Sequence, residues 1–181
     1  AIQAVASLGA SLRICSKDIS VVQVDAAVLS SIFQTVSGDL ATDLEAQKRL
    51  VSNVAGSLVS MYTVPNANTA VLDSVKAQAL AFLNSSTGTT LTDAADATQA
   101  ASSLHSLIVL PGSLSSAQTA SAVGMFNRFS ASSFGMLLSG SATIDFAIEV
   151  SPLLVGGSLN VLGKMISTRG SRRILQYNSS M

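Results

Sequence analysis

The chain has 181 residues, enough to bury one hydrophobic core, so one or two domains are expected. Its 10 basic and 10 acidic residues cancel, which leaves no net field to steer nucleic acid and argues against nucleic-acid binding. Only 11% of residues are charged, so the polar surface must consist largely of hydroxyl and amide groups, as in many extracellular or assembled proteins.

The core is expected to consist of small side chains, because 48% of residues are hydrophobic but only 4% are aromatic, with no Trp. Small side chains let helices approach one another closely. No run reaches the roughly 18 uninterrupted apolar residues of a membrane span, so membrane contact is expected only through segments outside this chain. The first residues lack a charged n-region, which indicates a mature product or an excerpt of a longer protein.

The first third of the chain predicts three helices from apolar residues at spacings of three and four. The first covers 1–12, and the second covers 22–36 with an apolar face formed by Val24, Val28, Ile32 and Val36. The third covers 40–61, with an apolar face formed by Leu40, Leu44, Val51, Val54, Leu58 and Met61. Pro65 and Asn66 then end this helix.

The stretch 68–110 predicts a pair of amphipathic helices. The first has an apolar face of Val71, Leu72, Val75, Ala79, Phe82 and Leu83, from which Asp73, Lys76 and Gln78 are expected to point away. The second has an apolar face of Ala94, Ala97, Ala101, Leu104 and Ile108. Residues 84–90 contain no apolar side chain and are expected to form an exposed loop between the two helices.

A further helix is predicted after the Pro111-Gly112 turn. Ser115 and Gln118 fit a capping box, and Ala122, Phe126, Phe129 and Ser133 continue one helical face. The repeated alternation of helix and short loop predicts an antiparallel helical bundle or a layered helical array over 1–138.

The pattern changes after Ser139. Residues 144–150 alternate between apolar and smaller or charged side chains, which favours a half-buried strand, and 159–162 resembles a second short strand. Helix remains an alternative for 137–150, because seven residues do not settle the period. The expected fold is therefore mainly α, with a helical domain at 1–138 and a short β segment and linker at 139–181.

No catalytic, cofactor-binding or metal-binding residue is predicted, and the chain is not expected to be an enzyme. His105 is the only histidine and lies mid-helix, where a side chain bonded to solvent or backbone is the simplest interpretation. One His and one Cys are too few for a zinc site. The carboxylate pairs Asp39/Asp43 and Asp93/Asp96 lie at predicted helix starts, where the helix dipole favours them.

Two glycosylation sequons begin at Asn84 and Asn178, and Asn84 is the better candidate because it falls in the predicted exposed loop. The lone Cys15 cannot form an internal disulfide. It is either available for a disulfide to a partner outside this chain or a buried small apolar residue, and the sequence leaves both open.

The helix pairs resemble the helical part of the receptor-for-egg-jelly (REJ) and GAIN-type regions of polycystin-like proteins. The similar segments are 49–58, the helix 75–83 with its polar loop, and Leu91-Thr92 with the Ala-rich helix up to Leu107. Residues 158–166 resemble the way such helical layers lead into a following β-sandwich. The 172–176 segment and the Ala/Ser bias also resemble green-algal surface proteins.

The resemblance implies a non-catalytic module on the extracellular side of the plasma or ciliary membrane. Such a module spaces or anchors neighbouring domains and contacts protein partners, among them an extracellular fibre and a channel subunit. The family's cleavage tripeptide of His, Leu and Ser or Thr is absent, because Ser106 follows His105, so no proteolytic residue is carried over. The alternative is a secreted subunit that self-assembles into a fibre or matrix, which low charge and Ala/Ser-rich helices also suit.

Overall fold

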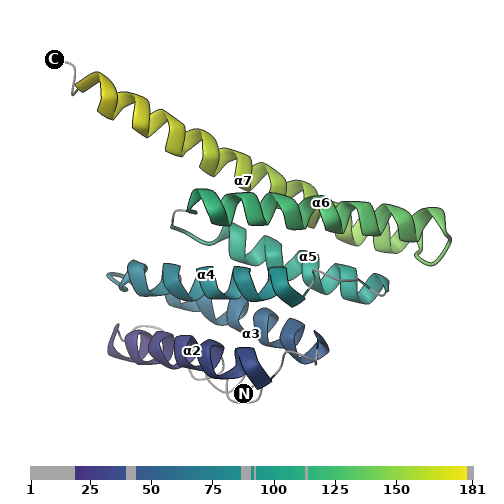
Figure 1. Cartoon of the computed structure of the whole chain (residues 1–181), viewed down its shortest axis with the longest axis horizontal. Coiled ribbons are helices and arrows are strands. Elements are labelled where there is room, and N and C mark those ends of the chain that lie inside the picture. Colours follow the sequence, from purple (N-terminus) through teal and green to yellow (C-terminus); the bar gives the residue numbers. More distant parts are fainter. Residues whose placement is uncertain (1–18, 40–43, 87–90, 92, 113, 179–181) are drawn as a thin grey trace.

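A computed structural model describes residues 19–39, 44–86, 91, 93–112 and 114–178 (Figure 1). Six helices make up most of this part, and it contains no strand. They are α2 (Ile19–Asp39), α3 (Leu44–Tyr62), α4 (Thr69–Ser86), α5 (Ala94–Val109), α6 (Ser116–Leu138) and α7 (Ile144–Asn178). The predicted mainly helical fold is confirmed.

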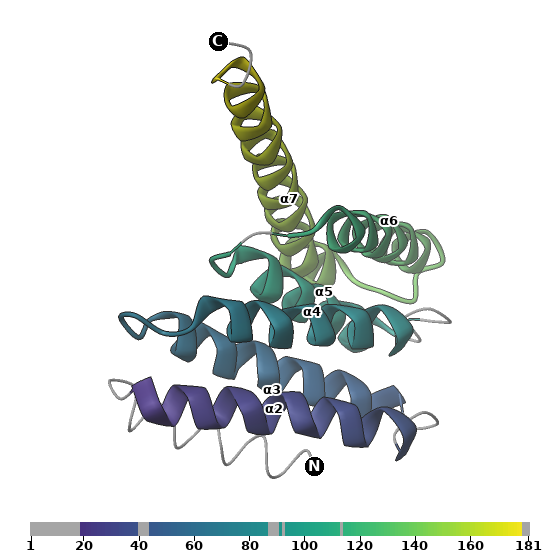
Figure 2. The same ribbon diagram turned by 60° about the vertical axis from the view of Figure 1, so that its left-hand side comes forward.

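The helices form two layers. In one layer α2 packs on α4 and α4 on α6, and in the other α3 packs on α5 and α5 on α7. Helices that follow one another in the sequence, such as α3 and α4 or α6 and α7, pack across the layers. Figures 1 and 2 show the stack rising from α2 at one end to α7 at the other. Stacked helix pairs of this kind are the architecture of α-solenoids, in which each unit contacts only its neighbours.

Two helix starts follow their predicted caps. Asp93 is the N-cap of α5, and its Oδ1 accepts a hydrogen bond from the Asp96 amide at 2.9 Å. The Ser115 hydroxyl accepts from the Gln118 amide at 3.1 Å, while Gln118 Oε1 accepts from the Ser115 amide at 2.7 Å. The predicted capping box of α6 is therefore confirmed, and it satisfies two amides that the helix itself leaves unpaired.

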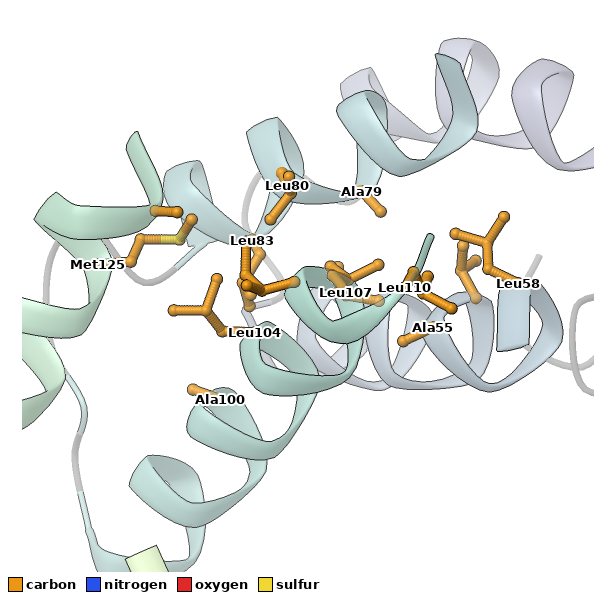
Figure 3. Packing of buried hydrophobic residues seen from close by; sticks show 14 of the residues in the cluster. Ala55, Leu58, Ala79, Leu80, Leu83, Ala100, Leu104, Leu107, Leu110 and Met125 are labelled. Carbon is orange, nitrogen blue, oxygen red and sulfur yellow. The ribbon is translucent and has the colours of Figure 1, made fainter. Parts of the chain in front are cut away.

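The core runs through both layers as one cluster. Leu58 of α3, Leu80 and Leu83 of α4, Leu104 and Leu107 of α5, and Met125 of α6 converge there (Figure 3). Small residues such as Ala55, Ala79 and Ala100 lie between them, so the helices approach closely. The predicted inner faces of α3, α5 and α6 are buried wherever the structure describes their side chains, Ala94 being only partly buried.

The predicted inner face of α2 is wrong at Val24 and Val28, which are exposed, whereas Ile32 is partly buried against the core. Val24 is 61% exposed, whereas the buried face consists of Val22, Ala26, Leu29 and Phe33. Both stripes have helical spacing, and α4 covers the one that carries the larger side chains. The ring of Phe33 meets that of Phe82 edge-on with centroids 5.6 Å apart, a contact that the other stripe could not make.

The predicted β segment at 144–150 and 159–162 is also wrong, because both stretches belong to α7. In a strand Ile144, Phe146, Ile148 and Val150 would share one face. In the structure Phe146 and Val150 are buried, whereas Ile144 and Ile148 are 77% and 68% exposed. Burial continues at Leu154 and Val161, so the period is that of a helix packed on α5 and α6. The expected boundary at Ser139 is the turn between α6 and α7.

Several predictions lie outside the described residues: the helix at 1–12, Cys15, Asp43 and Leu40. Asp39 is the last residue of α2. In α7 the side-chain description ends at Ile166.

Candidate functional site

Four polar side chains meet where α5 ends: Tyr62 at the end of α3, Asp73 and Lys76 on α4, and Lys164 on α7. They surround the α5–α6 loop at Leu110, Pro111 and Gly112. We call these four residues the lysine clamp. Tyr62 and Lys164 are 102 positions apart in the chain, so the site forms only because the helices stack on one another.

Lys76 is the centre of the clamp, and the prediction that it points away from the core is wrong. Its side chain is 0% exposed. Its Nζ donates to the carbonyl of Pro111 at 2.9 Å, lies 3.2 Å from Asp73 Oδ1, and stands over the Tyr62 ring at 5.6 Å from the centroid. A buried ammonium needs such partners because its hydration is lost.

Tyr62 completes the pairing of Asp73. Its hydroxyl donates to Asp73 Oδ1 at 2.6 Å, the oxygen that also faces Lys76. Burial raises the pKa of Tyr62, and the hydrogen bond to Asp73 and the negative charge of that carboxylate raise it further. Tyr62 therefore stays a neutral donor throughout the physiological pH range.

Lys164 reaches the same loop from α7. Its Nζ donates to the carbonyl of Leu110 at 2.7 Å and lies 3.3 Å from the carbonyl of Gly112. Burial lowers the pKa of Lys164, and the positive charge of Lys76 lowers it further. With the opposing effect of Asp73 included, the pKa is about 8. The two lysines together place positive charge at the carboxyl end of α5, where free carbonyls and the helix dipole favour it.

The contacts of the lysine clamp hold parts of the fold together. The hydrogen bonds of the clamp residues described above run to backbone carbonyls and to one carboxylate within the cluster. Gly112 has φ +94°, and a Cβ there would overlap the Asp73 carboxylate, so the loop passes directly over the cluster. The clamp ties α3, α4 and α7 to the end of α5.

The pKa of Lys164 predicts a pH dependence. Its folded-state pKa lies below the ordinary 10.5, so its stabilising contribution is present above 10.5 and is lost as pH falls through about 8. We therefore expect the urea midpoint to rise between pH 8 and pH 10 in the wild type, but less in Lys164→Met. Above pH 10 the raised pKa of Tyr62 acts in the opposite direction, so the comparison is confined to this window. An equal rise of the urea midpoint with pH in the wild type and in Lys164→Met would contradict the assignment of the lowered pKa to Lys164.

A small cavity of about 320 Å³ adjoins the clamp. Tyr62, Leu110 and Pro111 line it together with His105, Val59 and Val109. His105 is half-buried on α5, and its Nδ1 lies 3.2 Å from the carbonyl of Leu153 on α7. This backbone contact agrees with the prediction of a helix-flank histidine bonded to solvent or backbone.

A larger groove of about 590 Å³ lies between α3, α5 and the start of α7. Hydroxyl groups of Ser52, Thr98, Ser102 and Thr143 line it, and the carboxylates of Asp145 and Glu149 stand on its α7 side. Asp96 of the predicted carboxylate pair lies on α5 and is paired with Lys48 of α3 at 2.7 Å, with both side chains largely buried. Within the described residues no group of three His, Cys, Asp or Glu side chains is placed to hold a metal ion.

The two sequons differ in what the structure describes. Asn84 lies in the last turn of α4 instead of in an exposed loop, and its Oδ1 accepts a hydrogen bond from Arg128 Nη2 of α6 at 2.6 Å. Its side chain is half-buried. Asn178 is the last residue of α7, and its side chain lies beyond the described ones, as Cys15 does.

The clamp is not apparent from the sequence, because its members are remote from one another along the chain. Asp73 and Lys76 stand three residues apart on one helix, a spacing that also occurs in solvent-exposed ion pairs. What marks the pair as buried is its contact with Tyr62 and Pro111, which the chain order does not reveal.

No protein-family model, no curated protein and no solved structure matches this chain. The resemblance to polycystin-like proteins therefore stays a prediction. Among the described helices, the stretch Ile144–Ile166 of α7 is long and apolar enough to cross a membrane by length and composition, with mean hydropathy 1.4. About 28% of it is buried within the protein, and a helix packed on its own domain meets the same criteria.

Proposed function

We propose that this chain is a non-catalytic helical module that spaces or anchors neighbouring domains of a polycystin-like surface protein and contacts protein partners there. The observation that carries the proposal is the path of the chain through the stack. The described chain enters at α2, at one end of the stack, and leaves along α7, at the other end (Figures 1 and 2). Segments attached at these two places would be held apart.

Stiffness is the physical requirement for a spacer, and two features support it. One core cluster connects α2 through to α7. The lysine clamp adds charge-assisted hydrogen bonds between α4, α7 and the α5–α6 loop, and such bonds are stronger than those between neutral groups.

The polar groove offers a surface for partners. Hydroxyl-lined surfaces form hydrogen bonds with little electrostatic steering, and the neutral, low-charge chain suits that mode of contact. In the proposed setting the partners are proteins at the extracellular side of the plasma or ciliary membrane, such as a fibre and a channel subunit.

A distance measurement tests the spacer. Spin labels at Val24→Cys and Ile166→Cys, in a Cys15→Ser background and diluted with unlabelled chain, should give one narrow distance distribution. Both positions are exposed, so labelling should leave the core intact. Labels at Ala120→Cys and Ala131→Cys, both within α6, provide the control for label motion. A broad distribution for the first pair beside a narrow one for the second would contradict a rigid spacer.

Glycosylation tests the proposed location. When the chain is directed through the secretory pathway of a eukaryotic cell, we expect a glycan at Asn84 that peptide N-glycosidase removes and Asn84→Gln abolishes. Loss of the Arg128 hydrogen bond should cost little stability, because that contact is exposed. The variant Asn178→Gln removes the second sequon, so that a glycan at Asn178 can be distinguished from one at Asn84. A chain that carries no glycan at either site would count against an extracellular location.

A self-assembling secreted subunit remains the second candidate. The observation that favours it is the set of large apolar side chains that α6 and α7 leave exposed, among them Phe134, Leu138 and Leu159. Terminal layers of helical stacks need either a polar outer face or a partner.

A further inference from the structure

The outer side of α7 carries an apolar stripe. Its members are Ile144, Ile148, Val155, Leu159, Leu162 and Ile166, all between 51% and 77% exposed. The side chains that α7 buries, Phe146, Val150, Leu154 and Val161, lie on the opposite side of the same helix. At 3.6 residues per turn these two sets cannot share a face. Helix α7 is therefore apolar on two sides, and only one of them is covered by α5 and α6.

The stripe has the spacing of a coiled-coil seam. From Ile148 onward its members Val155, Leu159, Leu162 and Ile166 follow at intervals of seven, four, three and four residues. This is the a/d pattern that pairs helices along their length. The stretch 148–166 is about 28 Å long at 1.5 Å per residue. In both views the C-terminal part of α7 projects beyond the other described helices, so a second helix has access to it (Figures 1 and 2).

The charges along α7 indicate which partner helix would pair with the apolar stripe, and in which direction. The N-terminal end carries Asp145 and Glu149, both exposed, and the C-terminal end carries arginines at 169, 172 and 173. Asp145 lies fourteen residues before Leu159 and Arg173 fourteen after it, so both occupy the heptad register of Leu159. In an antiparallel pair of α7 helices crossing at Leu159, the acidic end of each copy lies beside the arginine end of the other. A parallel pair would place like charges together, which disfavours it.

We propose that two copies of this chain associate through the outer faces of their α7 helices, antiparallel and centred on Leu159. The contact is isologous, because the same stripe serves both copies, so it closes a dimer and does not extend a fibre. Gly163 lies beside the stripe with no atom within 4 Å of the place where a Cβ would stand, so a second backbone can approach there. Burying the stripe in this way removes an apolar surface that monomeric proteins seldom expose.

A lipid surface is the competing occupant, and the charges argue against it. Asp145 and Glu149 lie beside the stripe, where an apolar membrane interior would have to accommodate two carboxylates. An arginine-bearing helix end supplied by a second copy neutralises them instead.

The test measures association of the 181-residue chain by sedimentation equilibrium. We expect a concentration-dependent monomer–dimer equilibrium, which Leu159→Asp weakens about a hundredfold or more, because it buries two carboxylates, one from each copy, at the centre of the interface. The control Val24→Asp, at an equally exposed valine of α2, should leave association unchanged. Circular dichroism of both variants checks that the helices are intact, since neither side chain contributes to the monomer core.

Charge exchange tests the antiparallel orientation. Asp145→Arg alone and Arg173→Glu alone should each weaken association, whereas the double variant should restore it toward the wild-type value, because both pairs are again opposite in sign. In a parallel pair the double variant would gain nothing. Four outcomes would overturn the proposal. The wild-type chain could stay monomeric, Leu159→Asp could leave association unchanged, or the double variant could fail to restore association. In the fourth, the chain instead floats with phosphatidylcholine–phosphatidylserine vesicles. The spacer function would survive such a result, because the end-to-end distance in α2 and α7 is measured independently.

Discussion

Replacing Asp73 with Ala should lower the free energy of unfolding by about 3 kcal/mol, the cost of leaving a buried charge without its partner. Lys76 is completely buried, and Asp73 is the only carboxylate with which it forms an ion pair among the described contacts. Without Asp73, the ammonium keeps the Pro111 carbonyl and the Tyr62 ring as partners, neither of which carries a full negative charge. Chemical denaturation followed by circular dichroism measures the change.

A double-mutant cycle isolates the ion pair. Lys76→Met removes the charge and keeps most of the side-chain volume, so the double variant Asp73→Ala/Lys76→Met should be more stable than Asp73→Ala alone. The control Asp145→Ala removes an exposed carboxylate of α7 and, at concentrations where the monomer predominates, should change stability by less than about 0.5 kcal/mol. If the double variant were less stable than Asp73→Ala, the unpaired ammonium would not be the cause.

Replacing Gly157 with Ala should destabilise the protein by about 2 kcal/mol through overpacking between α6 and α7. A Cβ at position 157 would overlap the ring of Phe126, which is itself buried and cannot swing into solvent. The expected loss exceeds the gain of up to about 1 kcal/mol that Ala brings to a helix interior. Thermal or urea unfolding measures the net change in stability that results from the two effects.

Gly163→Ala supplies the matched control, six residues further along the same helix. No atom lies within 4 Å of its Cβ position, so only the helix-propensity gain remains and the variant should be slightly more stable than the wild type. Equal effects of the two substitutions would mean that α7 does not approach α6 as closely as Phe126 and Gly157 indicate. In the paired chain Gly163→Ala also adds a methyl group beside the stripe, so its stability is best compared at concentrations where the monomer predominates.

Local signals determined much of the fold. The caps of α5 and α6 could be predicted because Asp93, Ser115 and Gln118 act on amides within three residues of themselves. The inner faces of α3, α5 and α6 could be predicted because each of these helices has one dominant apolar stripe. Composition predicted close helix packing, since the small side chains of a core of Ala, Val and Leu let helices approach one another closely.

The errors occur where a segment has two apolar stripes. Helix α2 presents Val24 and Val28 on one side and Leu29 and Phe33 on another, and the contact with α4 selects between them. Helix α7 is apolar on two sides, so its pattern within seven residues imitates the alternation of a strand. Its length and its burial period become apparent only when α5 and α6 cover one side.

By itself, then, the sequence determined that the chain is mainly helical, where most helices before α7 begin and end, and that it is rich in hydroxyl groups and low in charge. Only the tertiary structure decided that Lys76 is buried, that Lys164 joins it at the end of α5, and that one side of α7 stays apolar and uncovered. The physical reason is distance along the chain. Helix formation and capping depend on neighbours within a few residues, whereas the burial of a charge or of an apolar stripe depends on partners that the packing brings from 35 to 54 residues away.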